Sequence, residues 1–160
     1  IILRPTMVYG GFNTSKDSNI EVIKKILKKL PFILLPNNSG LRQPIHAFQL
    51  SRIVLNLFEK NLKNKDQIIK NKILNVGGDE CLSYTKMIQR VSEKIHAGKS
   101  LKKNNIILIP NRLFCMIIFP TLFFSPKVYE SLLRIMVDLS GFKKSYKVSD
   151  LKPEKFLFQE

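Results

Sequence analysis

Residues 1–11 read IILRPTMVYGG, and this stretch is the starting point for the fold. Its apolar run predicts a buried strand over residues 1–8, and the two glycines after Tyr9 permit a turn. A second run of the same form, residues 73–76, is followed by Gly77-Gly78 and predicts another strand. Two apolar runs that each stop at glycines are typical of strands in a layered α/β fold.

Segments with helical periodicity lie between and after these strands. Residues 19–30 place isoleucines and leucines on one face and four lysines on the other, and Pro31 ends this helix. Residues 48–62 predict a second helix with Ile53, Val54, Leu57 and Phe58 on its buried side. Further helices are predicted after the N-cap Ser83 and over residues 127–139. Short strands are predicted over residues 32–35 and 106–109, so the fold class is α/β.

Length and composition fit one globular domain or a large piece of one. The chain has 160 residues, is 44% hydrophobic and 24% charged, and has two cysteines, Cys81 and Cys115. Two cysteines are too few for a disulfide framework, so a reducing compartment is expected and the localisation is predicted to be cytoplasmic. Because the chain opens with Ile in an apolar run, we expect a fragment that lacks an upstream part.

The charge is strongly positive, at +15, but lysines outnumber arginines 21 to 6 and are spread along the chain. A compositional bias explains such a spread without a partner. A functional anion site within that bias is the second explanation. Nucleic acid is not expected, because base readout relies on arginine and on aromatic residues placed among the basic ones, whereas here lysine predominates and most phenylalanines lie in apolar runs.

No self-sufficient catalytic motif is present in the chain. Glycine-rich phosphate loops, a nucleophile elbow and a zinc-protease motif are all absent from the sequence. His46 and His96 stand fifty residues apart without a cluster of further ligands, so no metal site is predicted.

The most hydrophobic run covers residues 113–124, LFCMIIFPTLFF. It is shorter than the roughly 20 residues that a membrane-spanning helix needs. A buried helix or the wall of a substrate cleft is the first interpretation, and an interfacial membrane contact is the second.

Five segments, in order, resemble the C-terminal half of extended short-chain dehydrogenases/reductases, the NAD-dependent nucleotide-sugar epimerase/dehydratase family. They are LRPTMVYG at 3–10, Asn19-Ile20, GLRQPIH at 40–46 continued by QLS at 49–51, LNVGG at 74–78 followed by Leu82-Ser83, and Arg134, Asp138 with LKPEKF at 151–156. The resemblance covers essentially the whole chain.

The resemblance implies the last part of a Rossmann-type NAD(P)-binding fold with a small α/β substrate-binding subdomain. Residues 1–12 and about 70–80 would supply late Rossmann strands, and about 13–69 and 81–160 the substrate-binding portion. The whole would be one incomplete domain without its N-terminal dinucleotide-binding half. The implied function is that of a nucleotide-sugar epimerase, dehydratase or reductase in surface polysaccharide or cell-envelope sugar synthesis.

The resemblance also implies roles for individual residues. Pro5 and Thr6 would lie beside the nicotinamide of NAD or NADP, where proline offers no N–H to compete for the carboxamide. Met7 and Asn19 would face the substrate. Arg42 and Arg134 would clamp the pyrophosphate of the nucleotide sugar.

The family's catalytic Tyr-x-x-x-Lys pair is expected upstream of this chain. None of Tyr9, Tyr84, Tyr129 and Tyr146 has lysine four positions later, so no catalytic residue is assigned and the chain alone is expected to be inactive. Three substitutions depart from the family pattern: Met7 for a frequent Asn, Gln49 for a usual Asp, and Gln43-Pro44 for an Asp-aromatic pair.

Two other functions remain open. A non-catalytic relative could bind a nucleotide or a partner protein, and a basic binder of nucleic acid or anionic lipid would show strongly salt-dependent association. Two further partners also remain open: a peripheral contact with the inner face of the membrane, and a second copy in a homodimer of the full-length protein.

Overall fold

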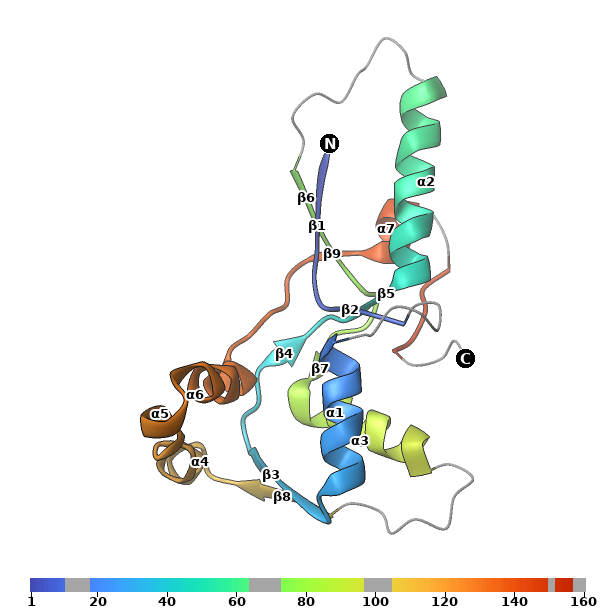
Figure 1. Cartoon of the computed structure of the whole chain (residues 1–160). Helices are drawn as coiled ribbons and strands as arrows, with labels where there is room; N and C mark the ends of the chain where they lie inside the picture. The colour runs from blue at the N-terminus through green and yellow to red at the C-terminus, as the bar shows by residue number, and fades with distance from the viewer. Residues whose placement is uncertain (11–17, 64–72, 97–104, 150–151, 157–160) are drawn as a thin grey trace. The chain divides into compact units, whose positions relative to one another are not determined.

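The computed structural model describes residues 1–10, 18–63, 73–96, 105–149 and 152–156 (Figure 1). The chain is a mixed α/β protein with parallel strands, so the predicted α/β class is confirmed. It divides into two compact units. Unit 1 contains Ile1–Ile20, Gln43–Cys81 and Ser140–Glu160, and unit 2 contains Glu21–Arg42 and Leu82–Leu139.

Unit 1 is built on a three-stranded parallel sheet. Its strands are β1 (Ile2–Pro5), β6 (Ile73–Gly77) and β9 (Lys143–Lys144), in the order β1-β6-β9. The two apolar runs recognised in the sequence therefore pair with each other, with Leu3 opposite Leu74.

The expected single buried strand over residues 1–8 is wrong in two respects. The run breaks at Thr6 and Met7 into β1 and a two-residue strand, β2 (Val8–Tyr9), which pairs with β5 (Ile45–His46). Also, Ile2 is 56% exposed. The physical reason is position: within the described residues β1 is an edge strand with β6 as its one partner, and after the Thr6 N–H donates to Val76 O the chain leaves β6 and pairs with β5 instead.

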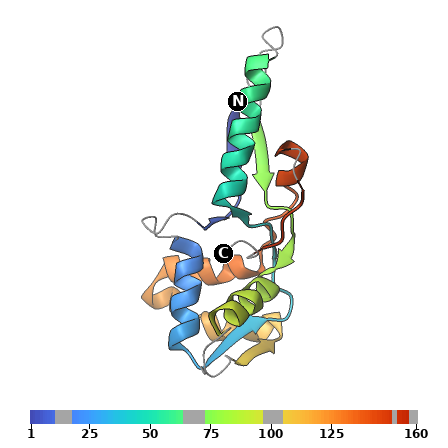
Figure 2. The same cartoon turned by 90° about the vertical axis from the view of Figure 1, so that its right-hand side faces the viewer.

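Helix α2 (Ala47–Lys63) runs alongside β1 and β6, as Figures 1 and 2 both show. Its Ile53 is fully buried together with Ile45, Leu74 and Val76, and Leu50 and Leu57 pack against this cluster. The helix predicted over residues 48–62 is confirmed, but fewer of its apolar residues are buried than the sequence predicts. Val54 and Phe58 are exposed, because a narrow stripe of the helix is enough to cover so small a sheet.

The buried Asp79 connects three parts of unit 1. Its Oδ1 accepts hydrogen bonds from Ser145 Oγ (2.7 Å) and the Tyr146 N–H (2.8 Å), both in α7 (Ser145–Ser149). Its Oδ2 accepts from Gln49 Nε2 (3.3 Å) in α2 and from the Glu154 N–H (2.9 Å). This network holds α7, which follows directly on β9, against the rest of unit 1.

Unit 2 contains two small strand pairs and two longer helices. Strand β3 (Phe32–Pro36) pairs in parallel with β8 (Asn105–Ile109), and β4 (Leu41–Arg42) pairs antiparallel with β7 (Leu82–Ser83). The helices are α1 (Ser18–Lys29), which lies in unit 2 from Glu21 onward, and α3 (Tyr84–His96). The predicted N-cap is confirmed, since Ser83 Oγ accepts from the Lys86 N–H (3.2 Å).

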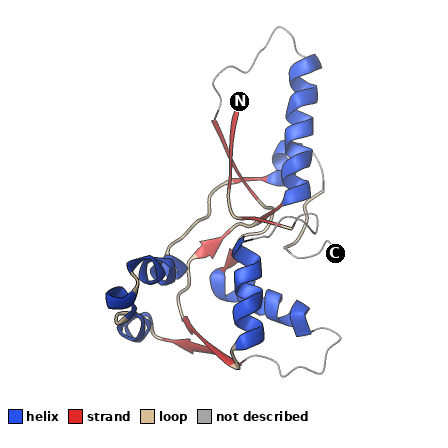
Figure 3. Ribbon diagram, viewed as in Figure 1, coloured by secondary structure: helices blue, strands red, loops and turns tan. Residues whose placement is uncertain are grey.

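Three short helices complete unit 2: α4 (Asn111–Ile118), α5 (Thr121–Phe124) and α6 (Pro126–Leu133), followed by the 3₁₀ turn η1 (Arg134–Met136). They gather into one group (Figures 1 and 3). Phe114, Ile118 and Ile135 form its core. The helix predicted over residues 127–139 is shorter than expected, because the chain becomes extended at Val137.

The hydrophobic run at residues 113–124 is not a buried helix. Phe114 and Ile118 are buried, whereas Met116 is 72%, Phe123 77% and Phe124 89% exposed. No helix in the described part of the chain combines the length and the apolar character that a membrane span requires. The residues that follow α2, 64–72, lie outside the described residues.

Candidate functional site

The guanidinium of Arg42 lies inside unit 2 and is bound to three backbone carbonyls. Its Nη1 donates to the oxygens of Leu41 (2.8 Å) and Val137, and its Nη2 donates to the oxygen of Arg134. The residue is 6% exposed. A guanidinium has five N–H groups. Two of those on Arg42 therefore make no hydrogen bond to any residue that the structure describes.

The chain reaches this arrangement through a close main-chain approach at Gly40. The Gly40 N–H donates to Ile135 O (2.8 Å), and Gly40 O accepts from the Tyr84 N–H (2.9 Å). A Cβ on Gly40 would overlap the Val137 carbonyl, so only glycine allows the two segments to lie this close. The glycine that begins the GLRQPIH motif therefore positions the arginine two residues later.

Asp138 secures the same junction from the other side. Its Oδ1 accepts from the Leu41 N–H (2.7 Å), and the Leu139 N–H donates to Leu41 O (2.8 Å). Asp138 belongs to the R-x-x-x-D pattern seen in the sequence, but no role followed from that pattern. In the structure it fixes the backbone next to Arg42.

Tyr84 provides an aromatic face for Arg42, whose guanidinium carbon lies 5.4 Å from the ring centroid. Burial lowers the pKa of Arg42, and Tyr84 and Asp138 oppose that shift. Burial raises the pKa of the Tyr84 hydroxyl, and the positive charge of Arg42 opposes that shift. At neutral pH the site therefore holds a protonated guanidinium against a neutral phenol.

The structure brings Arg42 and Arg134 together although 92 residues separate them. Arg134 begins the 3₁₀ turn after α6, where its carbonyl accepts from Arg42 and its side chain is exposed to solvent. The two arginines therefore differ: Arg42 is held by the fold, whereas Arg134 presents its side chain to solvent. The Arg42 guanidinium thus contacts the backbone of Arg134, and we call these two residues the arginine site.

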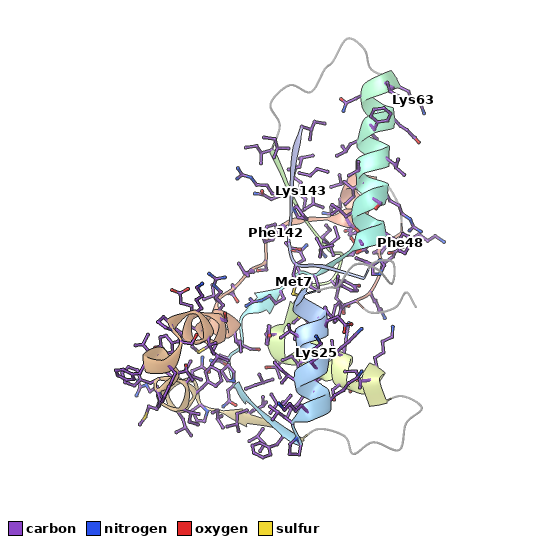
Figure 4. All side chains as sticks on the ribbon, viewed as in Figure 1. Met7, Lys25, Phe48, Lys63, Phe142 and Lys143 are labelled. Atoms are coloured by element: carbon purple, nitrogen blue, oxygen red, sulfur yellow. The ribbon has the colours of Figure 1, made fainter. Side chains whose placement is uncertain are left out.

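Pro5, Thr6 and Met7 lie in unit 1, where β1 gives way to β2 (Figure 4). Pro5 is exposed at the carboxyl end of β1. Thr6 Oγ1 donates to Gln43 O (2.5 Å), and Met7 O accepts from the Ile45 N–H (3.0 Å). Asn19 lies in the first turn of α1, and its side chain is outside the described residues.

Two glutamines that depart from the family pattern have structural partners in unit 1. Gln43 Nε2 donates to Gly78 O (2.8 Å) and Phe142 O (3.1 Å). Gln49 Oε1 accepts from the His46 N–H (2.9 Å), and its Nε2 donates to Asp79. Gln49 thus contacts a carboxylate thirty residues later in the chain, that of Asp79, which no local sequence signal revealed.

No grouping of three or more metal-ligating side chains is found among the residues described by the structure. No protein-family model matches this chain, and a search of curated proteins found no match to it.

Proposed function

We propose that this chain is the substrate-binding half of an NAD(P)-dependent nucleotide-sugar epimerase, dehydratase or reductase, in which the arginine site holds the diphosphate of the sugar nucleotide. The observation that carries the proposal is the proximity of Arg42 and Arg134 within unit 2. The resemblance in sequence implies that both arginines bind one ligand, and the contact of the Arg42 guanidinium with the Arg134 carbonyl supports this role.

The two arginines would contribute to diphosphate binding in different ways. Arg134 has an exposed side chain that can meet one phosphate with two parallel N–H groups. Arg42 would contribute charge and its two remaining N–H groups from a fixed position. Since its guanidinium is already ordered by three carbonyls, little conformational entropy would be lost on binding.

One residue of unit 1, Pro5, has a position that would suit contact with the nicotinamide of a bound dinucleotide. Pro5 is exposed where the parallel strand β1 ends, the edge at which dinucleotides lie in such sheets, and it offers no competing N–H. When bound, the nicotinamide would accept a hydride from the sugar and return it. The roles proposed for the residues of this chain are binding and orientation, and the proton-transferring tyrosine is expected upstream.

The test is calorimetric titration of the chain with UDP-glucose, dTDP-glucose, GDP-mannose and inorganic pyrophosphate. Arg134→Gln is the informative variant, because its side chain is exposed and its removal leaves the Arg42 contacts in place. We expect saturable binding of at least one sugar nucleotide, weakened about tenfold or more in Arg134→Gln. Arg112→Gln, an exposed arginine in α4, is the matched control and should bind as the wild type does.

Two results would contradict the proposal. One is the absence of saturable binding by the folded chain to every probe. The other is equal weakening by Arg134→Gln and Arg112→Gln, with affinity falling steeply as salt rises, which is the behaviour of a non-specific polycation.

A further inference from the structure

The group formed by α4, α5 and α6 has an outer surface that is strongly apolar. In α4, Phe114 and Ile118 face the core of the group, so Leu113, Met116 and Ile117 lie on the opposite face and are exposed. In the short helix α5, Phe123 and Phe124 are the most exposed large hydrophobic side chains of the described residues. We call these five residues the apolar surface.

Basic residues lie in the first turns of the helices that carry or adjoin the apolar surface. Arg112 is the second residue of α4 and Lys127 the second residue of α6, and both are exposed, as is the one acidic residue of α6, Glu130. The sequence contains no Asp or Glu between Glu93 and Glu130. Exposed phenylalanines and long apolar side chains next to basic residues are the combination that binds at the interface of an anionic membrane.

We propose that the apolar surface docks this protein onto an anionic membrane, with Phe123 and Phe124 inserted among the lipid headgroups and Arg112 and Lys127 paired with lipid phosphates. The contact is peripheral, since α4 and α5 have eight and four residues. It is independent of the arginine site, and either proposal can fail without the other.

Charge favours a membrane over a second copy of the chain as the occupant of this surface. A symmetric contact would bury the same patch of both copies and so bring Arg112 and Lys127 of both into one interface. Each chain also carries a net charge of +15. Like-charged surfaces repel on approach, whereas an anionic bilayer attracts this surface.

The chain contains no tryptophan, so a single introduced tryptophan reports on one position. Phe123→Trp places the reporter on the apolar surface. Phe58→Trp is the matched control, because Phe58 is a 61% exposed aromatic residue on α2 in unit 1. Both proteins are mixed with vesicles of phosphatidylcholine alone, of phosphatidylcholine with phosphatidylglycerol, and of the same mixture with brominated acyl chains.

We expect the emission of Phe123→Trp to shift to the blue on anionic vesicles and to be quenched by brominated lipid, with little change for Phe58→Trp. Adding Arg112→Gln and Lys127→Gln should weaken the partition about tenfold, and high salt should act in the same direction. Neutralising two lysines of α1, Lys25→Gln and Lys28→Gln, is the charge-matched control and should have a smaller effect (Figure 4).

Three outcomes would overturn the proposal. The first is an unchanged Phe123→Trp spectrum with folded protein on every vesicle. The second is an equal shift at both reporter positions. The third is a blue shift that grows with protein concentration in the absence of lipid, which would show that a second copy covers the surface.

Discussion

Arg42 uses three of its five N–H groups to hold the carbonyls of Leu41, Arg134 and Val137 in the interior of unit 2. A buried arginine bound in this way supports the backbone on which a second arginine is mounted. Its importance for folding and its importance for ligand binding must therefore be separated by experiment.

Replacing Arg42 with alanine should destabilise unit 2 by about 2 kcal/mol, because the Val137 carbonyl loses its donor, the Leu41 and Arg134 carbonyls are each left with one backbone donor, and the packing of a buried side chain is lost. The midpoint of urea unfolding, followed by circular dichroism, measures this loss. Arg112→Ala is the control, since Arg112 is exposed, and should change the unfolding free energy by less than about 0.5 kcal/mol. Equal midpoints for the two variants would contradict the structural role of Arg42.

Tyr84 should make the stability of unit 2 depend on alkaline pH. Burial raises the pKa of its hydroxyl in the folded state, although Arg42 opposes the shift. The unfolded chain therefore releases this proton first, near pH 10, and folding stability falls as the pH rises above that value. Below about pH 9 both states are protonated and the contribution is constant.

Tyr84→Phe isolates this effect by removing the ionisable group and keeping the ring beside Arg42. The difference in unfolding free energy between wild type and Tyr84→Phe should be constant up to about pH 9 and should then shift against the wild type. Urea unfolding at a series of pH values measures it. A difference independent of pH up to about 11 would contradict the raised pKa.

At the scale of elements, Asp79 attaches α7 and the segment at Glu154 to α2 in unit 1. All four groups that meet its carboxylate are donors. Asp79→Asn places an amide N–H₂ where two of these donors converge, so it should destabilise unit 1 by about 3 kcal/mol although its size is nearly unchanged. Hydrogen exchange should show α7 losing protection first, because its five residues cannot form a stable helix alone.

Glu93→Gln is the control for Asp79→Asn, because Glu93 is an exposed carboxylate on α3 in unit 2. It should leave the exchange of α7 unchanged. Equal protection of α7 in both variants would show that packing against α2, and not Asp79, holds this helix.

At the scale of the whole molecule, each unit has a separate hydrophobic cluster, one around Ile53 and one around Phe114. The chain alternates between the units, so neither is a continuous segment. Ile53→Ala and Phe114→Ala should each cost about 3 kcal/mol by opening a cavity in its own cluster. We expect hydrogen exchange to increase in α2 and β6 for the first variant and in α4 and α6 for the second.

The same two variants test whether the units are separate folding units. Loss of protection throughout the chain in both variants would show one cooperative unit instead of two.

Local pattern determined much of this fold. The periodicity of apolar residues located α1 and α2 to within a residue at each end, and Ser83 identified the start of α3 through its own hydroxyl. Gly77-Gly78 marked the end of β6, whereas its parallel partner β1 ends at Pro5, five residues before the glycine pair that was expected to end it. These features depend on interactions between residues within a few positions of each other, which a sequence displays directly.

Only the tertiary structure decided how distant residues meet. The contact of Arg42 with the Arg134 carbonyl, the network of Asp79, and the exposure of Met116, Phe123 and Phe124 have no local signature. The two-residue strands β4, β5 and β7 are each defined by pairing with a strand that is distant in sequence, so no local pattern predicts them. The sequence by itself determined the longer helices α1 and α2, the start of α3 and the strand β6, and it singled out the two candidate arginines. Whether an arginine is buried or exposed, and whether an apolar run is core or surface, depends on contacts across long sequence separations that hydrophobic pattern does not encode.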